Sequence, residues 1–236
     1  MRIKNNMTLT TLTQTAKAAR LKEALVLLAI LHRLAMQRIA GREAEAESVI
    51  ERSPASAGGE PDPEKELEAL ARLDPEAITR IHGRYFPDVY RFARYRLSDD
   101  VLAEDVAAET FARLLEYTYK GRGPRTNLRG WLMRTAANLV NDYYRAMYNR
   151  PTTDLPETLP ADNPGPVGAF EATEEKRRLH EALQTLTEEQ ANVLALRFGS
   201  GLSLAETADA LGKNANAIKA LQFRAIGALR RELVQA

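Results

Sequence analysis

Apolar residues recur every three or four positions along most of the chain, which is the period of an amphipathic α-helix. In the first fifty residues this pattern predicts one long helix, or two, over residues 12–51. Such an apolar stripe is too long to leave exposed on a soluble monomer. We therefore expect it to pack on the rest of the chain, on a second copy or on a separate regulator. The stripe consists of Leu21, Leu25, Leu28, Leu31, Ala35 and Ile39.

A break in the helical pattern follows. Residues 53–63, with the sequence SPASAGGEPDP, are rich in proline and glycine and predict a flexible segment. Residues 1–60 are therefore expected to be an appendage, with an autoregulatory or partner-binding role. A misassigned start, with Met7 or Met36 as the first residue, is the alternative explanation of this extension.

Three helices are predicted between residues 74 and 148. The first begins at Asp74-Pro75-Glu76, where Asp is a good N-cap and Pro fits the first turn, and it runs to about Leu97. The other two span about residues 101–117 and 128–148. Between them lies a basic, glycine-rich loop, KGRGP, at residues 120–124.

A proline-rich segment divides the rest of the chain. Five prolines fall between residues 151 and 166, which excludes a helix and predicts an extended acidic linker over residues 151–172. This linker defines one domain at residues 61–150 and another at 173–236. Since no segment alternates as a β-strand does, we predict an all-α chain of two small helical domains and an N-terminal helical extension.

The last domain has the pattern of a helix-turn-helix. Two capping boxes, at Thr187–Gln190 and Ser203–Glu206, each predict the start of a helix. Gly212 ends the helix at 204–211, and Asn214 caps another that runs to about Val234. The N-terminal part of such a second helix enters the DNA major groove, although a plain helical hairpin is the alternative interpretation. The residues predicted to face DNA are Asn216, Lys219, Ala220, Phe223 and Arg224.

Composition excludes several classes of protein. The absence of cysteine rules out disulfides, thiolate metal sites and thiol nucleophiles, and it favours a cytoplasmic location. His32, His82 and His180 are too far apart in sequence to suggest a metal site. The longest apolar run near the N-terminus is far shorter than the roughly 20 residues of a membrane span. Without a nucleotide-binding loop or nucleophile motif, we expect no cofactor, no catalytic residue and no enzymatic activity.

The net charge of +1 conceals blocks of opposite sign. Residues 99–116 hold six acids against one base, whereas residues 117–150 hold seven bases against one acid. Residues 151–171 then hold four acids and no base. Such alternation predicts several charged partners, because a single phosphate ligand would need only the basic block.

Two helices carry these charges on one face. In the helix at 101–117, Asp105, Glu109 and Glu116 lie opposite a small apolar face, which predicts a docking surface for a basic protein or, alternatively, a solvated surface. In the helix at 128–148, arginine, asparagine and tyrosine share a face. These side chains suit phosphate contacts, base edges and base stacking, so they favour nucleic acid over simple solvation. The residues of this second face are Arg134, Asn138, Asn141, Arg145 and Tyr148.

Residues 74–236 resemble the bacterial RNA polymerase sigma factors of the extracytoplasmic-function (ECF) group. The segments 103–106 (AEDV) and 109–111 (ETF) are similar to the polymerase-clamp helix of that family, although Ala108 replaces its usual Gln. Residues 130–132 (GWL), with Ala136, Asn138, Asp142 and Arg145, resemble its minus-ten-reading helix. Residues 186–190 (LTEEQ) and the helix-turn-helix resemble its minus-thirty-five domain, with Ala217 and Leu221 departing from the family's polar Thr and Arg.

This resemblance implies a transcription initiation factor whose partners are core RNA polymerase and promoter DNA. It leaves open whether an anti-sigma factor holds the chain inactive. A free-standing helix-turn-helix regulator that binds an operator without polymerase is the alternative function. The implied polymerase contacts are Glu104, Asp105, Glu109 and Phe111, and the implied minus-ten contacts are Lys120, Arg122, Arg134, Asn138, Asn141 and Arg145. The implied minus-thirty-five contacts are the five residues predicted to face DNA.

Overall fold

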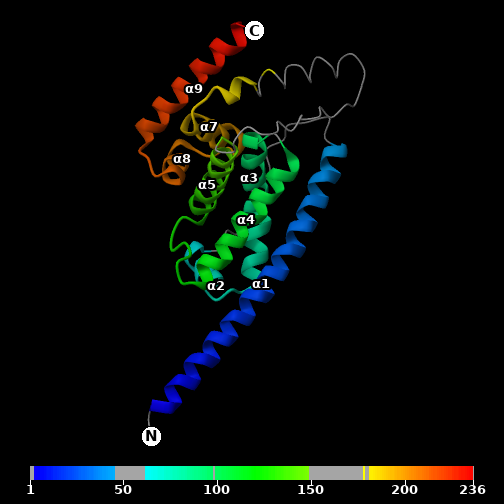
Figure 1. Cartoon of the computed structure of the whole chain (residues 1–236), viewed down its shortest axis with the longest axis vertical. Coiled ribbons are helices and arrows are strands. Elements are labelled where there is room, and N and C mark those ends of the chain that lie inside the picture. The colour runs from blue at the N-terminus through cyan, green and yellow to red at the C-terminus, as the bar shows by residue number, and fades with distance from the viewer. Residues whose placement is uncertain (1–2, 46–61, 98, 149–177, 179–180, 236) are drawn as a thin grey trace.

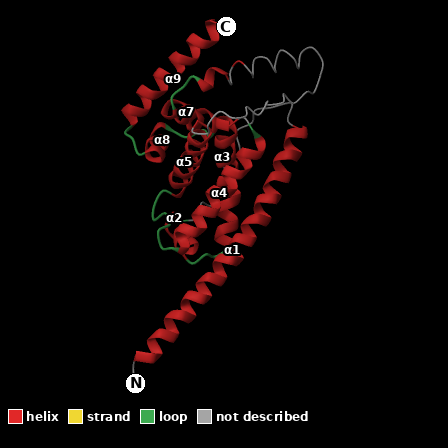
Figure 2. Ribbon diagram, viewed as in Figure 1, coloured by secondary structure: helices red, strands yellow, loops and turns green. Residues whose placement is uncertain are grey.

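The computed structural model describes residues 3–45, 62–97, 99–148, 178 and 181–235. All regular structure within these residues is helical (Figure 2), which confirms the all-α prediction. The predicted linker at 151–172 and most of the predicted break at 53–63 lie outside the described residues. The helices are α1 (Ile3–Glu45), α2 (Pro63–Ala71), α3 (Pro75–Leu97), α4 (Asp100–Tyr119), α5 (Leu128–Tyr148), α7 (Glu188–Leu194), the π-helical turn η1 (Ala195–Gly199), α8 (Leu204–Leu211) and α9 (Ala215–Gln235).

Helices α3, α4 and α5 form a three-helix bundle around an apolar core. Asp74 starts α3 as predicted, because its Oδ1 accepts a hydrogen bond of 2.9 Å from the Ala77 amide. The apolar face of α4 points into this core, where Phe92 of α3 and Met133 of α5 are also fully buried. That α4 face consists of Ala103, Ala107, Thr110 and Leu114.

Helix α2 was not predicted, because Pro63 was assigned to the flexible break. The sequence does carry a start signal there, since Asp62-Pro63-Glu64 repeats the pattern of Asp74-Pro75-Glu76. Asp62 Oδ1 accepts a hydrogen bond of 3.1 Å from the Glu64 amide. The proline and glycine residues just before it favour a flexible segment, and for this reason no helix was predicted there.

Helix α1 lies along α3 and α4, and its N-terminal end extends beyond the bundle (Figure 1). Leu28 is buried and lines a small cavity with Phe111 and Leu115 of α4. The Lys17 ammonium lies 5.3 Å from the centre of the Tyr119 ring at the far end of α4. The apolar stripe of the extension therefore packs on its own chain, through Leu21, Leu25, Leu28, Leu31, Ala35 and Ile39.

The C-terminal domain, α7 to α9, contains the predicted helix-turn-helix. Both capping boxes are present, at the starts of α7 and α8. Gly212 ends α8 with a φ of +63°, a conformation that favours glycine. Asn214 Oδ1 then accepts a hydrogen bond of 2.8 Å from the Ala217 amide and starts α9. The turn η1, in which the Ser200 amide donates to the Ala195 carbonyl, was not predicted.

The C-terminal domain packs directly against the bundle. Helix α8 contacts α5, and η1 contacts α3. Leu196 and Leu202 are fully buried and belong to the same apolar cluster as the bundle core. Sequence periodicity gave no indication of this contact, because the pattern of each helix describes only its own buried face.

Candidate nucleic-acid and protein interfaces

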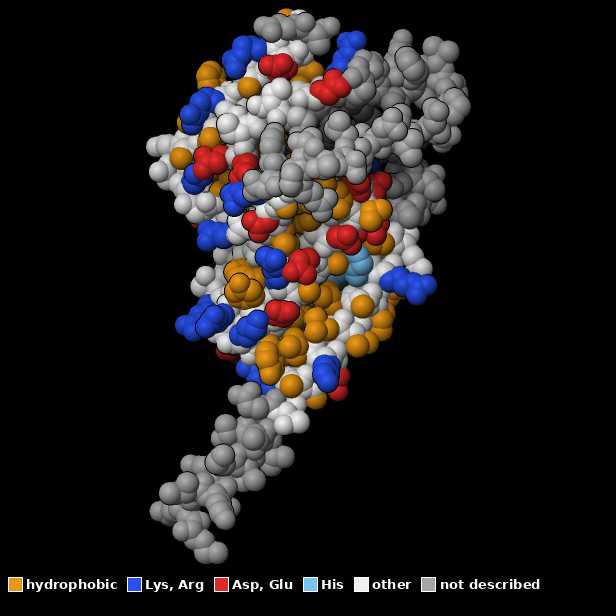
Figure 3. Space-filling model, in the orientation of Figure 1, with side chains coloured by type: hydrophobic (Ala, Val, Ile, Leu, Met, Phe, Trp, Pro, Cys, Tyr) orange, Lys and Arg blue, Asp and Glu red, His pale blue; other side chains and the backbone are white. Residues whose placement is uncertain are grey.

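The acidic face of α4, formed by Asp105, Glu109 and Glu116, is exposed to solvent. Two of its members make local ion pairs along the helix. Glu109 Oε1 lies 2.8 Å from Arg113 Nε, and Glu116 Oε2 lies 3.3 Å from Lys120 Nζ. Both pairs are partly exposed and weak, so the carboxylates can exchange these partners for another at little cost. Figure 3 shows acidic side chains on the surface of the bundle beside α1.

Two other residues expected to contact polymerase are less accessible. Glu104 is half-buried on the side of α4 that faces α1. Phe111 is only 2% exposed, and its ring lies 4.8 Å from that of His82. Phe111 is therefore part of the core between α1, α3 and α4 and not of the exposed acidic face, and its contact with polymerase stays a prediction.

The polar face of α5, formed by Arg134, Asn138, Asn141 and Arg145, is exposed except at Asn141, which is partly buried. Asn138 is exposed. Arg134 donates hydrogen bonds to two carbonyl groups at the end of α8, from Nε to Ala210 O at 2.9 Å and from Nη2 to Asp209 O at 2.7 Å. The C-terminal domain therefore occupies part of the face that the sequence assigned to minus-ten DNA.

The far end of the same face also contacts this domain. Asn141 Oδ1 accepts a hydrogen bond of 3.2 Å from Asn192 Nδ2. Arg145 Nη2 lies 3.2 Å from Glu188 Oε2, in the first turn of α7. Of the four residues of the α5 polar face, three thus make polar contacts with the C-terminal domain.

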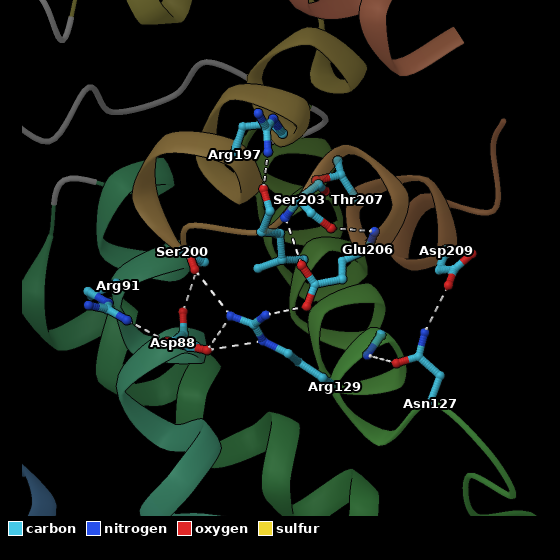
Figure 4. A network of polar contacts seen from close by, with 12 residues as sticks. Asp88, Arg91, Asn127, Arg129, Arg197, Ser200, Ser203, Glu206, Thr207 and Asp209 are labelled. Atoms are coloured by element: carbon cyan, nitrogen blue, oxygen red, sulfur yellow. Dashed lines mark hydrogen bonds and ion pairs between the residues drawn. The ribbon is translucent and has the colours of Figure 1, made fainter. Parts of the chain in front are cut away.

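Arg129, at the start of α5, is a residue that sequence analysis did not single out. Its guanidinium joins Asp88 Oδ2 of α3 at 2.8 Å and Glu206 Oε1 of α8 at 2.6 Å (Figure 4). Ser200 closes the network, because its hydroxyl donates to the Asp88 carbonyl at 3.0 Å. Arg129 belongs to the basic block of the sequence, but charge alone does not distinguish it from its neighbours.

The electrostatics of this network favour the charged forms. Burial opposes charge on Arg129, but the Asp88 and Glu206 carboxylates outweigh it and raise the pKa of Arg129. Burial also opposes ionisation of Glu206, but hydrogen bonds from Ser203 and the charge of Arg129 lower its pKa. Glu206 therefore has two roles, since it completes the capping box of α8 and pairs with the bundle.

Lys120 and Arg122 lie apart from the polar face of α5. Both are exposed in the loop between α4 and α5, where Gly121 adopts a φ of +73°. Arg145 is 17 residues beyond the first residue of α5, which corresponds to about 25 Å along the helix. The six residues assigned to minus-ten DNA therefore do not form one compact cluster: two lie in the loop, and the other four are spread from Arg134 to Arg145 along α5.

The five residues predicted to face DNA on α9 lie on one exposed face, at helical spacing. Phe223 is 81% exposed, and Asn216 and Lys219 lie about two turns and one turn before it. Leu221 is buried against α8 and fixes the orientation of the helix. The α9 face consists of Asn216, Lys219, Ala220, Phe223 and Arg224.

The described residues contain neither a cluster of metal ligands nor a helix that could span a membrane. No group of three or more His, Asp or Glu side chains is placed to hold a metal ion within the described ranges. Among the helices of the described chain, none is both long and apolar enough to cross a membrane.

Comparison with known proteins identifies the family. Residues 81–149 match the family model "Sigma-70 region 2", and residues 182–231 match "Sigma-70, region 4". The ECF RNA polymerase sigma factor SigD of Mycobacterium tuberculosis is 33% identical over 174 residues, which cover 69% of this chain and 80% of SigD. The chain belongs to the ECF sigma factors of the sigma-70 family.

This sigma factor also resembles the ECF RNA polymerase sigma factor BldN of Streptomyces coelicolor, with 36% identity over 166 residues. The match covers 68% of this chain and 61% of BldN. The structure of CnrH in complex with the cytosolic domain of CnrY has a similar fold, with a TM-score of 0.56 and 21% identity over 73% of this chain and 97% of CnrH. Helices α1 and α2 lie outside both family models.

Proposed function

We propose that this sigma factor binds core RNA polymerase and directs it to particular promoters, where it promotes opening of the DNA. The observation that carries the proposal is the set of three faces of different chemistry in the regions that match the family models. The α4 face is acidic, the α5 face combines arginine with amides, and the α9 face lies at the start of the second helix of a helix-turn-helix. Each face suits a different partner.

The acidic face of α4 is assigned to the polymerase. Asp105 and Glu109 project from a rigid helix into solvent, so a basic partner can reach them without disturbing the core. Close charge pairs across a protein interface are coupled by about 1.5–7 kcal/mol. Even the lower value corresponds to about a tenfold change in affinity.

The polar face of α5, with Lys120 and Arg122, is assigned to the strand-separated minus-ten element. Exposed Asn138 offers paired donor and acceptor groups to an unpaired base, while arginines contact phosphates. The α9 face is assigned to the minus-thirty-five duplex, with Lys219 and Arg224 at phosphates and Asn216 and Ala220 nearer to the bases. In this proposal the chain acts in the cytoplasm and catalyses no reaction, because the polymerase performs the chemistry.

Run-off transcription with purified core polymerase tests this proposal. The full chain should produce transcripts from discrete start sites in a genomic library. Charge reversal of both Asp105 and Glu109 to Lys should weaken binding to core polymerase at least tenfold, since each lost pair contributes about 1.5 kcal/mol or more. The matched control is reversal of Glu68 and Glu232, which are also exposed but lie on α2 and at the end of α9.

Two results would contradict these assignments. Unchanged affinity of the Asp105 and Glu109 variant for core polymerase would exclude the acidic face as its docking site. Sequence-specific binding to duplex DNA in the absence of polymerase, without any run-off product in its presence, would instead favour a free-standing regulator. That regulator would use the C-terminal domain but would leave the acidic face of α4 without a partner.

A further inference from the structure

Helix α1 is apolar on two opposite faces. One face, with Leu28 near its centre, packs on α3 and α4. The other face, the outer stripe, consists of Val26, Ile30 and Leu34, which are 62%, 53% and 48% exposed. Because these residues recur every four positions, they form one line along the helix. Figure 3 shows apolar side chains along the exposed side of α1.

The outer stripe belongs to a segment of α1 that is apolar on all sides. Residues 24–31, with the sequence ALVLLAIL, contain no polar side chain. A helix of this kind is normally buried on every side, and a contiguous apolar patch left on the surface of a soluble protein marks a binding surface. The bundle covers only one side of this segment, so in the described part of the chain the opposite side stays exposed.

Basic side chains flank the outer stripe on both sides. At 100° per residue, two bases lie within about 80° of Ile30 in one direction around the helix, and two lie within about 80° in the other. Residues 17–38 hold five bases against the single acid Glu23. The outer stripe is therefore set in a positively charged surface. The flanking bases, all exposed, are Lys22 and Arg33 on one side and Arg20 and Arg38 on the other.

A line of aliphatic side chains between two rows of bases is the pattern of a helix that lies in the surface layer of a membrane. The aliphatic side chains enter the boundary between headgroups and acyl chains, while the long stems of lysine and arginine place their charges beside lipid phosphates. We propose that α1 is a peripheral membrane site, which binds anionic phospholipids through its flanking bases and inserts the outer stripe between them. The helix lies on the membrane and does not cross it.

The position of α1 makes the outer stripe accessible to a flat surface. Helix α1 runs along one side of the bundle, and the outer stripe faces away from α3 and α4 (Figure 1). The axes of packed helices are about 8–10 Å apart, so the acidic face of α4 lies behind α1 as seen from the membrane. This separation is close to the Debye length of about 8 Å at physiological salt, which screens the repulsion between these carboxylates and anionic lipids.

A second copy of the chain fits the outer stripe less well than a membrane does. Stable protein interfaces bury about 1,200–2,000 Å² in total, far more than the exposed parts of three aliphatic side chains can supply. Two α1 helices packed through their outer stripes would also bring their flanking bases together, and like charges repel across an interface. A bilayer does not need such an area, because each Lys or Arg near an anionic surface strengthens binding about fivefold.

Sedimentation of the full chain with lipid vesicles tests this inference. One vesicle consists of phosphatidylcholine alone, and the other contains one part of phosphatidylglycerol to three of phosphatidylcholine. We expect the chain to partition at least tenfold more strongly onto the anionic vesicle, and high salt to remove most of that difference. No polymerase and no DNA enter this assay, so its outcome is independent of the proposed function.

Two variants separate the apolar and the charged contributions. The triple variant Val26→Gln, Ile30→Gln and Leu34→Gln keeps good helix formers on α1 but removes the outer stripe, and it should weaken partition at least tenfold. Its matched control changes three residues that are no less exposed, Val101→Gln, Met147→Gln and Val234→Gln, on α4, α5 and α9.

The charge variant is Lys22→Gln with Arg33→Gln, which should also weaken partition at least tenfold. Its control is Arg72→Gln with Arg230→Gln, because both of these bases are exposed but lie outside α1. Circular dichroism verifies that every variant keeps its helix content.

A fluorescent probe then locates the membrane contact. Because the natural chain has no cysteine, Gln37→Cys introduces a single thiol, about 20° from Ile30 around the helix, for an environment-sensitive dye. Anionic vesicles should shift the emission of this dye to shorter wavelength, whereas a dye on Glu232→Cys, at the end of α9, should not respond.

Four results would overturn the inference. The first is a chain that sediments with neither vesicle, and the second is equal partition onto both vesicles. The third is unchanged partition of the Gln triple variant, or unchanged emission at position 37 in a chain that sediments, since the membrane contact would then lie on another basic face. The fourth is a dimer, formed without lipid and lost in the Gln triple variant, which would assign the outer stripe to a second copy.

Discussion

His82 should make the stability of the bundle depend on pH. Its ring is 2% exposed and stacks on Phe86 with 4.8 Å between ring centres, while the Phe111 ring lies at the same distance. Within the described part of the chain, the His82 Nε2 atom has no hydrogen-bond partner. Burial, assisted by the nearby His32, lowers the pKa of His82 from 6.5 to about 4.

The sign of the effect follows from linkage between protonation and folding. In the unfolded chain His82 binds a proton below about pH 6.5, whereas in the folded chain it remains neutral until about pH 4. The free energy of unfolding therefore falls as the pH is lowered through this interval. At 1.36 kcal/mol per pKa unit the full loss is about 3 kcal/mol, and about 2 kcal/mol of it is reached by pH 5.

Urea unfolding of the wild type and of His82→Leu at pH 8 and pH 5 measures this loss. Leucine has a similar volume and does not titrate, so the difference in unfolding free energy between the two proteins isolates the histidine. Fluorescence of Trp131, the single tryptophan, reports on the bundle because its ring contacts Tyr117 of α4. We expect the wild type to lose about 2 kcal/mol more than the variant between the two pH values.

Identical pH dependence in both proteins would refute the reasoning. The other titratable groups near this site are His32, whose pKa is also lowered by burial, and Glu104 and Asp105 of α4, which act in the opposite direction. They are present in both proteins. A pH effect that survives in His82→Leu would therefore have to come from them or from more distant carboxylates.

Two further predictions concern α9 and α1. Lys219→Ala and Arg224→Ala should each weaken duplex binding for all sequences and reduce the slope of log affinity against log salt by about 1, as a salt titration would measure. Exchanging Asn216 and Ala220 should instead change the preferred upstream sequence, as selection from a random duplex library would measure. An unaltered preference would count against the orientation of α9. Leu28→Ala should weaken the packing of α1 on the bundle by about 2–5 kcal/mol and make α1 more sensitive to protease. The start sites mapped by run-off transcription should not change. An unchanged digestion pattern would mean that Leu28 does not anchor the helix.

Local signals were sufficient to predict most helices and their orientation. Helix starts are specified by one or two hydrogen bonds, as in the capping boxes at Thr187 and Ser203 and at Asp74. The end of α8 is specified by a single backbone conformation, that of Gly212. The buried face of α4 followed from helical spacing alone. Spacing also places Phe111 four residues after Ala107, on the buried side of α4. Helical periodicity alone would therefore have predicted a buried Phe111, whereas the family motif suggested a polymerase contact.

The contact between the two domains could not be predicted in the same way. The segment between them has no apolar pattern that would fix its path, and a basic residue contributes the same charge whether it faces solvent, DNA or a carboxylate. Helical spacing therefore places Arg134 on the polar face of α5 and Arg129 away from it, but it does not show what either guanidinium contacts. Only the three-dimensional arrangement shows that they meet Glu206 and the end of α8.

The near-neutral net charge of the chain reflects, in part, ion pairs between its two domains. Arg129 and Arg145 of α5 pair with carboxylates of the C-terminal domain, so the molecule offers less positive charge to a polyanion than its basic block would suggest. These ion pairs are partly exposed, with Arg145 at 61% and Glu188 at 42%, and such pairs stabilise by only about 0.2–1 kcal/mol each. The ion pairs therefore add little to the stability of the contact between the two domains, whereas the buried Leu196 and Leu202, which belong to the same apolar cluster as the bundle core, provide most of its cohesion.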